Sequence, residues 1–267
     1  MMTASLTPVL DQPVTVIASG LIDPADVPPT PTTLEEAAQR APDISQRLLD
    51  AVGQLGIPVG YPREQGGRII HDLFPIRSNA HRQISSSSLV DLGMHTETAF
   101  HPYRPDFVVL LCLRGDPAAH TTHASIDEIL ARLDADVIET LHEPRFITTV
   151  DESFMSLGEG DHEFITAPLS TDHGTTRLIF DEQLMRGTDP TSTAALGELS
   201  KAITNCVRST VLSAGDLLVI DNHRAVHGRS HFTPRFDGTD RWLRRALVLR
   251  EAPPSSDFDG RLVTTAF

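Results

Sequence analysis

Short apolar runs recur along most of the chain, with Gly, Pro or Asp close to their ends. Runs of this length that are rich in Val, Ile, Leu or Phe are typical of β-strands. The pattern therefore predicts a protein built mainly from sheets. The expected strands are FVVLLCLR (107–114), FITTVD (146–151), HEFITAPLS (162–170), TRLIFDE (176–182), DLLVID (216–221) and WLRRALVLR (242–250).

Three segments instead carry apolar residues at helical spacing. Residues 34–56 have apolar positions three and four apart, with a helix start signal at Pro42. Residues 125–142, in which Ser125 is a candidate cap, and residues 192–210 predict two further helical segments. These helices interrupt or precede the strands, so they are expected to flank the sheets.

Two stretches lack a strong periodic pattern. Residues 1–32 are rich in Pro and Thr and predict an extended N-terminal arm with one short strand or helix cap. Residues 57–88 are rich in turn formers and predict loops and edge structure. Without an internal repeat or a linker, we expect a single domain over residues 1–267. The expected fold is mainly β with flanking helices, a double-stranded β-helix of the jelly-roll, cupin-like type.

Charge and cysteine content narrow the class of protein. The formal net charge is −14 and the pI is about 5.2, which argues against nucleic-acid and membrane partners. Cys112 and Cys206 form no CxxC pair, so neither a disulfide scaffold nor a thiolate zinc site is expected. No stretch resembles a signal peptide or a membrane span, and a cytoplasmic protein is expected. The sequence does not fix the oligomeric state.

Residues with metal-binding chemistry concentrate in two places. His95 and Glu97 stand two residues apart before a predicted strand, and at this spacing side chains of an extended segment project from one face. An imidazole and a carboxylate placed in this way can bind one cation. The second place, after a predicted strand near the C-terminus, contains His223, His227 and His231. One of these histidines would complete a set of two imidazoles and one carboxylate, which leaves three coordination positions open on iron(II).

An HxE pair alone is a weak signal, but a second feature supports it. Arg241 follows His227 by fourteen residues and enters the last predicted strand. A buried keto acid needs its remote carboxylate neutralised by a planar, bidentate donor, and a guanidinium provides one. The zinc-protease signature HExxH is absent from the chain.

Two long motifs carry a family resemblance. They are HTETAFHPYRPDFVVLLCLR (95–114) and VIDNHRAVHGRSHFTPRFDGTDRWLRR (219–245). In these motifs the chain resembles the clavaminate synthase-like branch of the taurine dioxygenase-type iron(II)/2-oxoglutarate oxygenases. It is similar in particular to the arginine and asparagine β-hydroxylases of non-ribosomal peptide pathways. The resemblance covers residues 60–250 approximately.

The resemblance implies roles for the matching residues. At the metal and cosubstrate it implies iron ligation by His95, Glu97 and His227, a salt bridge from Arg241 to the 2-oxoglutarate carboxylate, and a cosubstrate hydrogen bond from Thr122, or from Thr121 if the alignment is offset by one. At the substrate it implies that Arg245 binds the α-carboxylate, that Asp181 and Glu182 bind an amino or side-chain cation, and that Glu64 or Gln65 and Ser85 make further contacts. The acidic pair indicates a cationic substrate.

Four other residues are expected to be structural. His227 is preferred as the metal ligand over its neighbours because the family motif reads His-Gly-Arg at this point. His223 is therefore expected to support its loop, and His231 is not expected to bind the metal. His101 is expected to make structural hydrogen bonds, and Trp242 to pack beneath the site.

The implied enzyme uses Fe(II), 2-oxoglutarate and O₂ to hydroxylate an unactivated C–H bond, and it releases succinate and CO₂. The expected substrate is an amino acid, attacked at Cβ or Cγ, or an amino-acid-derived precursor in antibiotic biosynthesis. The retained Glu97 argues against a halogenase. Three alternatives stay open: desaturation or ring closure of a larger pathway intermediate, a non-catalytic jelly-roll binding protein, and a hydrolytic zinc enzyme.

Overall fold

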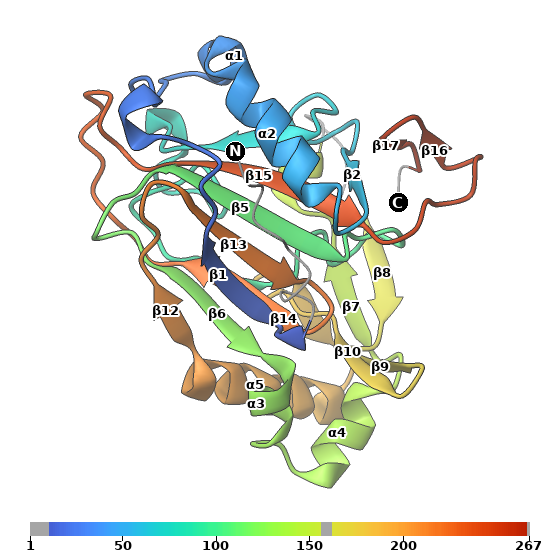
Figure 1. Ribbon diagram of the computed structural model, residues 1–267. Coiled ribbons are helices and arrows are strands. Elements are labelled where there is room, and N and C mark those ends of the chain that lie inside the picture. Colours follow the sequence, from blue (N-terminus) through green and yellow to red (C-terminus); the bar gives the residue numbers. More distant parts are fainter. Residues whose placement is uncertain (1–10, 156–161, 266–267) are drawn as a thin grey trace.

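A computed structural model describes residues 11–155 and 162–265. Its largest sheet, called here the major sheet, contains two of the long apolar strands as direct neighbours, β5 and β15 (Figure 1). All of its pairings are antiparallel. Its order is β1 (Val14–Ala18), β13 (Asp216–Asp221), β5 (Phe107–Arg114), β15 (Trp242–Leu249) and β2 (Ile57–Val59), with β3 (Ile70–Leu73) also paired to β15.

A second, shorter sheet, called here the minor sheet, brings the two metal-binding motifs together. Its strand order is β12-β6-β14-β4, again antiparallel, and β14 lies between β6 and β4. The two sheets confirm the expected jelly roll with flanking helices. The strands of the minor sheet are β12 (Arg208–Thr210), β6 (Thr121–Ser125), β14 (Ala225–Arg229) and β4 (Leu92–His95).

Smaller sheets lie to the right of β5 and β15 in Figure 1. One has the order β11-β7-β8, and two are hairpins. Their strands are β7 (Phe146–Thr149), β8 (Glu163–Thr166), β9 (Leu169–Asp172), β10 (Thr175–Leu178), β11 (Met185–Gly187), β16 (Phe258–Asp259) and β17 (Leu262–Val263).

Helices cover one face of each sheet. In Figure 1, α1 and α2 lie over the major sheet, and α3, α4 and α5 lie below the minor sheet. Three single 3₁₀ turns, η2 (Pro24–Asp26), η3 (Arg77–Asn79) and η4 (Glu152–Phe154), complete the helical elements described. The α-helices are α1 (Leu34–Gln39), α2 (Pro42–Val52), α3 (Ile126–Leu130), α4 (Ala135–Leu141) and α5 (Pro190–Cys206).

Alternation along β5 explains why both of its faces are apolar. Phe107, Val109, Leu111 and Leu113 pack with α2 in one core, while the intervening residues belong to a second core on the inner side of the major sheet. Burial on both faces of a strand produces an almost continuous apolar run. For this reason the strand appeared in the sequence with its observed bounds.

The structure corrects several predicted element bounds. The expected helix 34–56 is broken at Ala41, which has a φ of +45° and is followed by Pro42, and the expected helix 125–142 divides into α3 and α4. The segment 162–170 contains parts of two strands, β8 and β9. The region 57–88 was expected to be loop and edge structure, and β2 and β3 within it are edge strands that pair only with β15.

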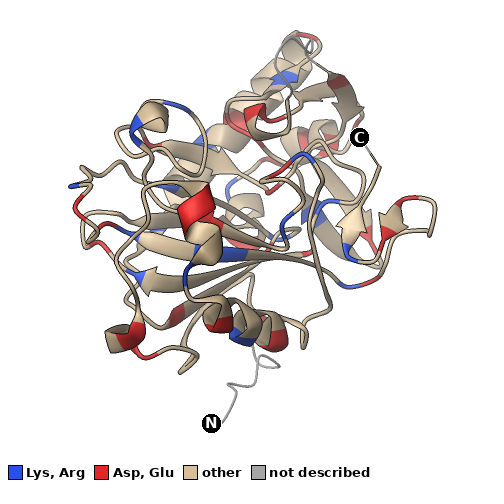
Figure 2. Ribbon diagram, turned by 90° about the horizontal axis from the view of Figure 1, so that it is seen from above, with Lys and Arg blue, Asp and Glu red and all other residues tan. Residues whose placement is uncertain are grey.

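The remaining expectations concern the arm and the surface. Part of the predicted N-terminal arm, β1, pairs with β13 at the edge of the major sheet. No helix in the described part of the chain is long and apolar enough to cross a membrane. Acidic positions occur on the helices and loops all around the molecule, with basic positions between them (Figure 2).

Candidate metal and cosubstrate site

Strand pairing in the minor sheet brings the two motifs together. His95, the last residue of β4, lies directly opposite His227 in β14, and Glu97 follows two residues later. One possible ligand atom from each of these three side chains lies within 4.8 Å of the others. Asn222 fixes the backbone of Glu97, because its side chain accepts from the Glu97 N–H at 2.7 Å and donates to the Glu97 carbonyl at 3.0 Å.

The surroundings of the three side chains suit metal binding. His95 donates from Nδ1 to the carbonyl of Gly93 at 2.9 Å, which leaves Nε2 as the ligand atom. Burial and the neighbouring His95 lower the pKa of His227 to about 4, so His227 is neutral. Burial raises the pKa of Glu97, but Arg245 and the two histidines outweigh this effect and hold the pKa below its ordinary value.

Two imidazoles and one carboxylate are the ligand set that suits iron(II) with open coordination positions. His227 Nε2 lies 3.6 Å from Glu97 Oε2, and the ring centroids of the two histidines are 4.4 Å apart. Within the described residues, His227 Nδ1 is buried without a hydrogen-bond partner. The donor set therefore fits the metal that the sequence motifs implied.

Arg241 directly precedes β15 of the major sheet, and its side chain contacts β6 of the minor sheet. It is 7% exposed, and its Nη2 donates to the hydroxyl of Thr121 at 3.1 Å. Burial lowers its pKa to about 10, and it forms no ion pair with any described residue. A buried guanidinium with no acidic partner lacks a counter-ion, and the carboxylate of a bound keto acid would provide one.

Of the two neighbouring threonines considered for the cosubstrate, Thr121 and not Thr122 lies beside Arg241. Successive residues of β6 point to opposite faces of the sheet. Thr121 is buried and contacts Arg241, whereas the Thr122 hydroxyl points to Met94 Sδ at 3.5 Å on the other face. Thr121 was the stated alternative for an alignment offset of one residue.

Arg245 is surrounded by acceptors. Its Nη1 donates to Glu97 Oε1 at 2.9 Å, its Nη2 forms an ion pair with Glu64, and Nη2 also lies 2.7 Å from His71 Nδ1. These side chains are all at least nine-tenths buried. The guanidinium therefore links the carboxylate of Glu97, a candidate metal ligand, to the carboxylate of Glu64.

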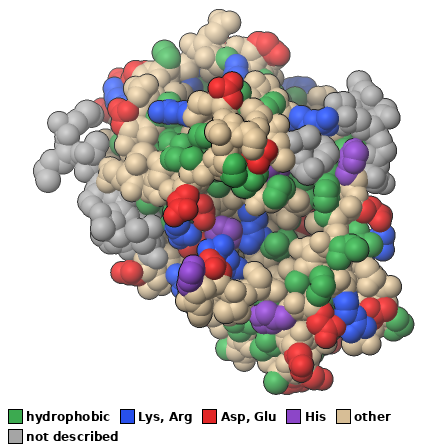
Figure 3. All heavy atoms as spheres, turned by 90° about the vertical axis from the view of Figure 1, so that its right-hand side faces the viewer, with side chains coloured by type: hydrophobic (Ala, Val, Ile, Leu, Met, Phe, Trp, Pro, Cys, Tyr) green, Lys and Arg blue, Asp and Glu red, His purple; other side chains and the backbone are tan. Residues whose placement is uncertain are grey.

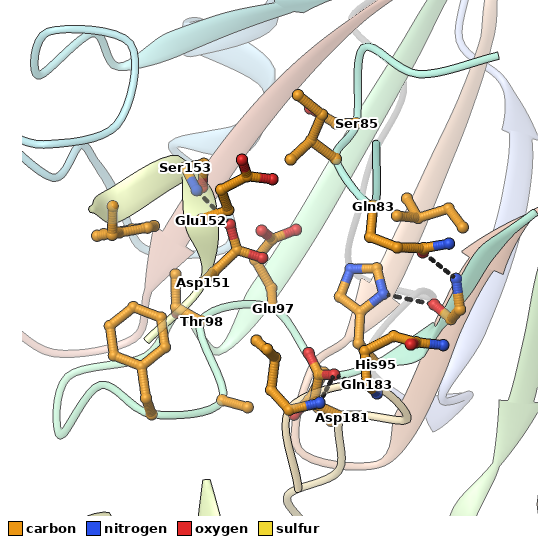
Figure 4. Close-up of a pocket in the computed structure, with 18 of the residues that line it drawn as sticks. Gln83, Ser85, His95, Glu97, Thr98, Asp151, Glu152, Ser153, Asp181 and Gln183 are labelled. Carbon is orange, nitrogen blue, oxygen red and sulfur yellow. Dashed lines mark hydrogen bonds between the residues drawn. The ribbon is translucent and has the colours of Figure 1, made fainter. Parts of the chain in front are cut away.

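A cavity of about 200 Å³ opens beside the metal ligands. In Figure 4 the carboxylates of Glu97, Asp151, Glu152 and Asp181 gather around it, with His95 at one side. Among the described lining residues, Arg245 is the only Arg or Lys. The predicted site residues that line the cavity are Glu64, Ser85, His95, Glu97, Asp181 and Arg245.

Two predicted substrate contacts do not line this cavity. Gln65 has a φ of +45° and donates to the carbonyl of Asp72 at 3.4 Å, so between the alternatives at 64 and 65 the cavity contains Glu64. Glu182 is exposed and accepts from the backbone N–H of Met94 at 3.0 Å. Each of them is next in sequence to a residue that does line the cavity.

Sequence reasoning missed several lining residues. Asp151 and Glu152 lie at the start of η4, and Gln83 and Gln183 lie on loops that border β4 (Figure 4). Each resembles a solvated polar residue when only the sequence is available. The one signal was Asp151 at the end of a predicted strand, where functional side chains often occur.

The four residues expected to be structural have the surroundings predicted for them. His223 accepts from Arg104 at 2.8 Å and lies 3.0 Å from Asp106. His101 contacts backbone atoms of Tyr103 and Thr265, and the exposed His231 pairs with Asp91. Trp242 is fully buried and donates to Asp72 at 2.8 Å.

The fold and the site together define an iron(II)/2-oxoglutarate-dependent oxygenase, and comparison with known proteins agrees. The family described as taurine catabolism dioxygenase TauD, TfdA family, matches residues 26–247. The chain belongs to this family, as its motifs implied. It is an enzyme of the dioxygenase class that uses iron and 2-oxoglutarate.

Particular relatives are amino-acid oxygenases. An L-lysine 3-hydroxylase of Catenulispora acidiphila is 39% identical over 267 residues, which span 94% of this chain and 72% of that protein. The structure of the non-haem iron oxygenase OrfP with Fe, succinate and (3S)-hydroxy-L-Arg has a TM-score of 0.86 and 31% identity, covering 97% of this chain and 84% of OrfP. Asparagine oxygenase with Fe(II), hydroxyasparagine and succinate has a TM-score of 0.84 and 31% identity, covering 95% and 80%.

Proposed function

We propose that this enzyme hydroxylates a free α-amino acid with a basic side chain, at Cβ or Cγ. The observation that carries the proposal is the ion pair between Arg245 and Glu64 in the wall of the cavity. A zwitterionic amino acid presents a carboxylate and an ammonium group next to each other. A guanidinium and a carboxylate next to each other are the complementary arrangement.

Arg245 and Glu64 can bind the carboxylate and the ammonium group of the substrate. Glu64 Oε2 is buried with no hydrogen-bond partner among the described residues, so it can accept from an ammonium group. Burial raises the pKa of Glu64 to about 7 against the opposing effect of Arg245, and a nearby ammonium would stabilise its charged form. The substrate carboxylate would then take the place of Glu64 on Arg245.

Carboxylates at other points of the cavity suit a cationic side chain. Asp181 accepts from the backbone N–H groups of Gln183 and Leu184 at 2.8 and 2.9 Å, and burial raises its pKa. Asp151 lines the same cavity. An amino acid with a second cationic group would compensate these negative charges, whereas an apolar side chain would not. These two carboxylates therefore favour a substrate of the lysine and arginine type.

The protein's own groups mainly position the reactants. When bound, the iron with 2-oxoglutarate and O₂ supplies an oxidant that can remove hydrogen from an unactivated carbon. His95, Glu97 and His227 would hold the iron, and Arg241 with Thr121 would hold the remote carboxylate of the keto acid. The groups at the two ends of the amino acid would fix which C–H bond faces the metal, and positioning of this kind decides the product.

The proposal also covers the setting of the reaction. Cys112 and Cys206 are both free and buried, which is typical of a reducing compartment, and this supports the cytoplasm. The partner is a small molecule. The expected lack of nucleic-acid and membrane partners, the single domain and a role in antibiotic biosynthesis stay predictions.

The test is succinate formation by the Fe(II)-loaded protein with O₂, 2-oxoglutarate and each of the twenty amino acids, followed by mass spectrometry. Lysine, arginine or a similar basic amino acid should raise succinate well above the rate without substrate and gain one oxygen atom. A product that has lost two hydrogens would change the reaction to desaturation or ring closure. Lysine amide and Nα-acetyl-lysine should be poor substrates, because each lacks one group of the zwitterion.

Two variants provide a matched control. Glu64→Gln should raise the KM of the responding amino acid about tenfold, because a hydrogen bond between charged groups is worth on the order of 1.5–3 kcal/mol. Gln65→Ala should change KM little, since Gln65 lies outside the cavity. A response restricted to the amide or to carrier-bound amino acids would contradict a free amino-acid substrate.

A further inference from the structure

The residue opposite Arg245 on the neighbouring strand is a histidine that neither motif contains. In the pairing of β3 with β15, His71 is the direct partner of Arg245, and it is fully buried. Its Nε2 lies 2.9 Å from the carbonyl oxygen of Arg68. Its Nδ1 lies 2.7 Å from Nη2 and 3.3 Å from Nε of Arg245. His71 does not line the cavity, whereas the guanidinium that it contacts does.

These two contacts assign the ring proton of His71. A carbonyl oxygen only accepts and a guanidinium only donates. Nε2 therefore carries the hydrogen and donates to Arg68, and Nδ1 accepts from Arg245. Burial, followed by the charge of Arg245, lowers the pKa of His71 to about 3, so the ring is a neutral acceptor.

The next residue of β3 shows what a charged partner does. Asp72 is paired with Arg244 on the opposite face of the sheet, where its carboxylate accepts from Arg244 at 3.0 Å and from Trp242 at 2.8 Å. β3 thus offers an acid to Arg244 and a neutral acceptor to Arg245. Arg244 also donates to the carbonyl oxygens of Arg40 and Ala41, so all three of its nitrogens bind within the protein.

A neutral acceptor at position 71 has a consequence for Arg245. Glu64 and Glu97 already contact this guanidinium, and a third carboxylate would compete with an incoming carboxylate. An imidazole fixes the orientation of the guanidinium without adding a third negative charge beside it. The contact between His71 and Arg245 is rigid, because both residues lie on paired strands of the major sheet.

We propose that His71 is a positioning residue that fixes the plane of Arg245, so that one guanidinium both holds the Glu97 carboxylate and receives the substrate α-carboxylate. The part that concerns the substrate rests on the proposed function. The part that concerns Glu97 does not, since that contact is made within the protein at 2.9 Å.

Two substitutions separate the two contacts of His71. Asn places its amide near the position of Nδ1, and Gln places its amide near the position of Nε2. His71→Asn therefore keeps an acceptor for Arg245, whereas His71→Gln keeps a donor to Arg68 and loses that acceptor. In anaerobic calorimetric titrations with Fe(II) and 2-oxoglutarate, His71→Gln should bind L-lysine, or the best amino acid of the panel above, about tenfold more weakly. His71→Asn should stay within about twofold of the wild type.

The coupling of the reaction gives a readout that a merely structural role would not move. A loosely held Arg245 should let His71→Gln form more succinate per hydroxylated product than His71→Asn. Equal behaviour of the two folded variants, or a larger loss in His71→Asn, would assign His71 to supporting the Arg68 loop and overturn the proposal. Thermal unfolding of both variants checks folding, and a folded His71→Asn with tenfold weaker binding is by itself sufficient to contradict it.

Co(II) binding without substrate separates this inference from the proposed function. Through Glu97, His71→Gln should bind Co(II) more weakly than His71→Asn in visible-absorption titrations. If the wild type binds Co(II) but responds to no free amino acid, the proposed function fails while the Co(II) comparison still decides the role of His71. Identical Co(II) affinities of the two variants would show that His71 does not act through Arg245 on Glu97.

Discussion

Two arginines four residues apart, Arg241 and Arg245, meet very different surroundings. Arg241 contacts one neutral hydroxyl, that of Thr121, and forms no ion pair with any described residue. Arg245 contacts two carboxylates and one imidazole. Both side chains are more than nine-tenths buried.

The difference indicates which ligand each arginine serves. A buried cation without a counter-ion is unfavourable in free energy. We therefore expect Arg241 to bind a ligand with a negative charge, such as 2-oxoglutarate. Arg245 is already neutralised and favours a ligand that replaces a charge pair by another charge pair, as a zwitterion does. We therefore expect the same residue type, just before β15 and within it, to bind two classes of ligand because its neighbours differ.

The largest effect is expected at Arg241. Arg241→Met should raise the 2-oxoglutarate KM about a hundredfold, because removal of a buried charged contact costs on the order of 3 kcal/mol. Co(II) affinity should change little, since Arg241 does not contact the metal ligands. Steady-state succinate formation and Co(II) titration measure the two quantities. An unchanged KM would sink the assignment of Arg241 to the cosubstrate.

The strands around the two arginines could be predicted from the sequence only where their burial leaves an apolar pattern. The long apolar strands β5, β13 and β15 were found with nearly their observed bounds, because burial on both faces leaves a continuous apolar run. β3 was missed. Two of its four residues, His71 and Asp72, are polar and buried, and their partners Arg244 and Arg245 lie more than 170 residues away in sequence.

The differences between the predicted contacts and the residues found at the candidate site are each of one position. Thr122, Gln65 and Glu182 were each adjacent to the residue that the structure places in the site or cavity. On the extended backbone of β6 a shift by one residue moves a side chain to the opposite face, whereas Gln65 and Glu182 lie in turns beside Glu64 and Asp181. The metal ligands were less sensitive, because the HxE spacing itself fixes a common face. Asp151 and Glu152 carried no such spacing and were missed.

Both arginine sites depend on one metal centre, which Gly228 helps to form. A Cβ at Gly228 would lie 2.6 Å from the carbonyl oxygen of Leu92 in β4, so Gly228→Ala should push β4 away from β14. We expect a loss of about 2 kcal/mol in stability. Weaker Co(II) binding should accompany it, because β4 carries His95.

The control for this substitution is a glycine in open space. Gly197→Ala, within α5, meets no atom within 4 Å and should raise stability by about 0.5–1 kcal/mol with unchanged Co(II) affinity. Chemical denaturation and Co(II) titration are the measurements. If Gly228→Ala binds Co(II) like the wild type, close approach of β4 to β14 is not what positions His95.

The smallest expected effect sharpens the comparison at the cosubstrate end. Thr121→Val removes the hydroxyl beside Arg241 at nearly constant volume, and loss of such a hydrogen bond costs about 1 kcal/mol, or about fivefold in the 2-oxoglutarate KM. Thr122→Val changes the other face of the same strand, next to Met94, and should leave that KM within about twofold. The amino-acid KM should stay the same in both variants, because Arg245 has its own partners. If Thr122→Val shows the larger effect, the hydroxyl that serves the cosubstrate is that of Thr122. The Thr121 hydroxyl is then not the neutral partner that distinguishes the Arg241 site from the Arg245 site.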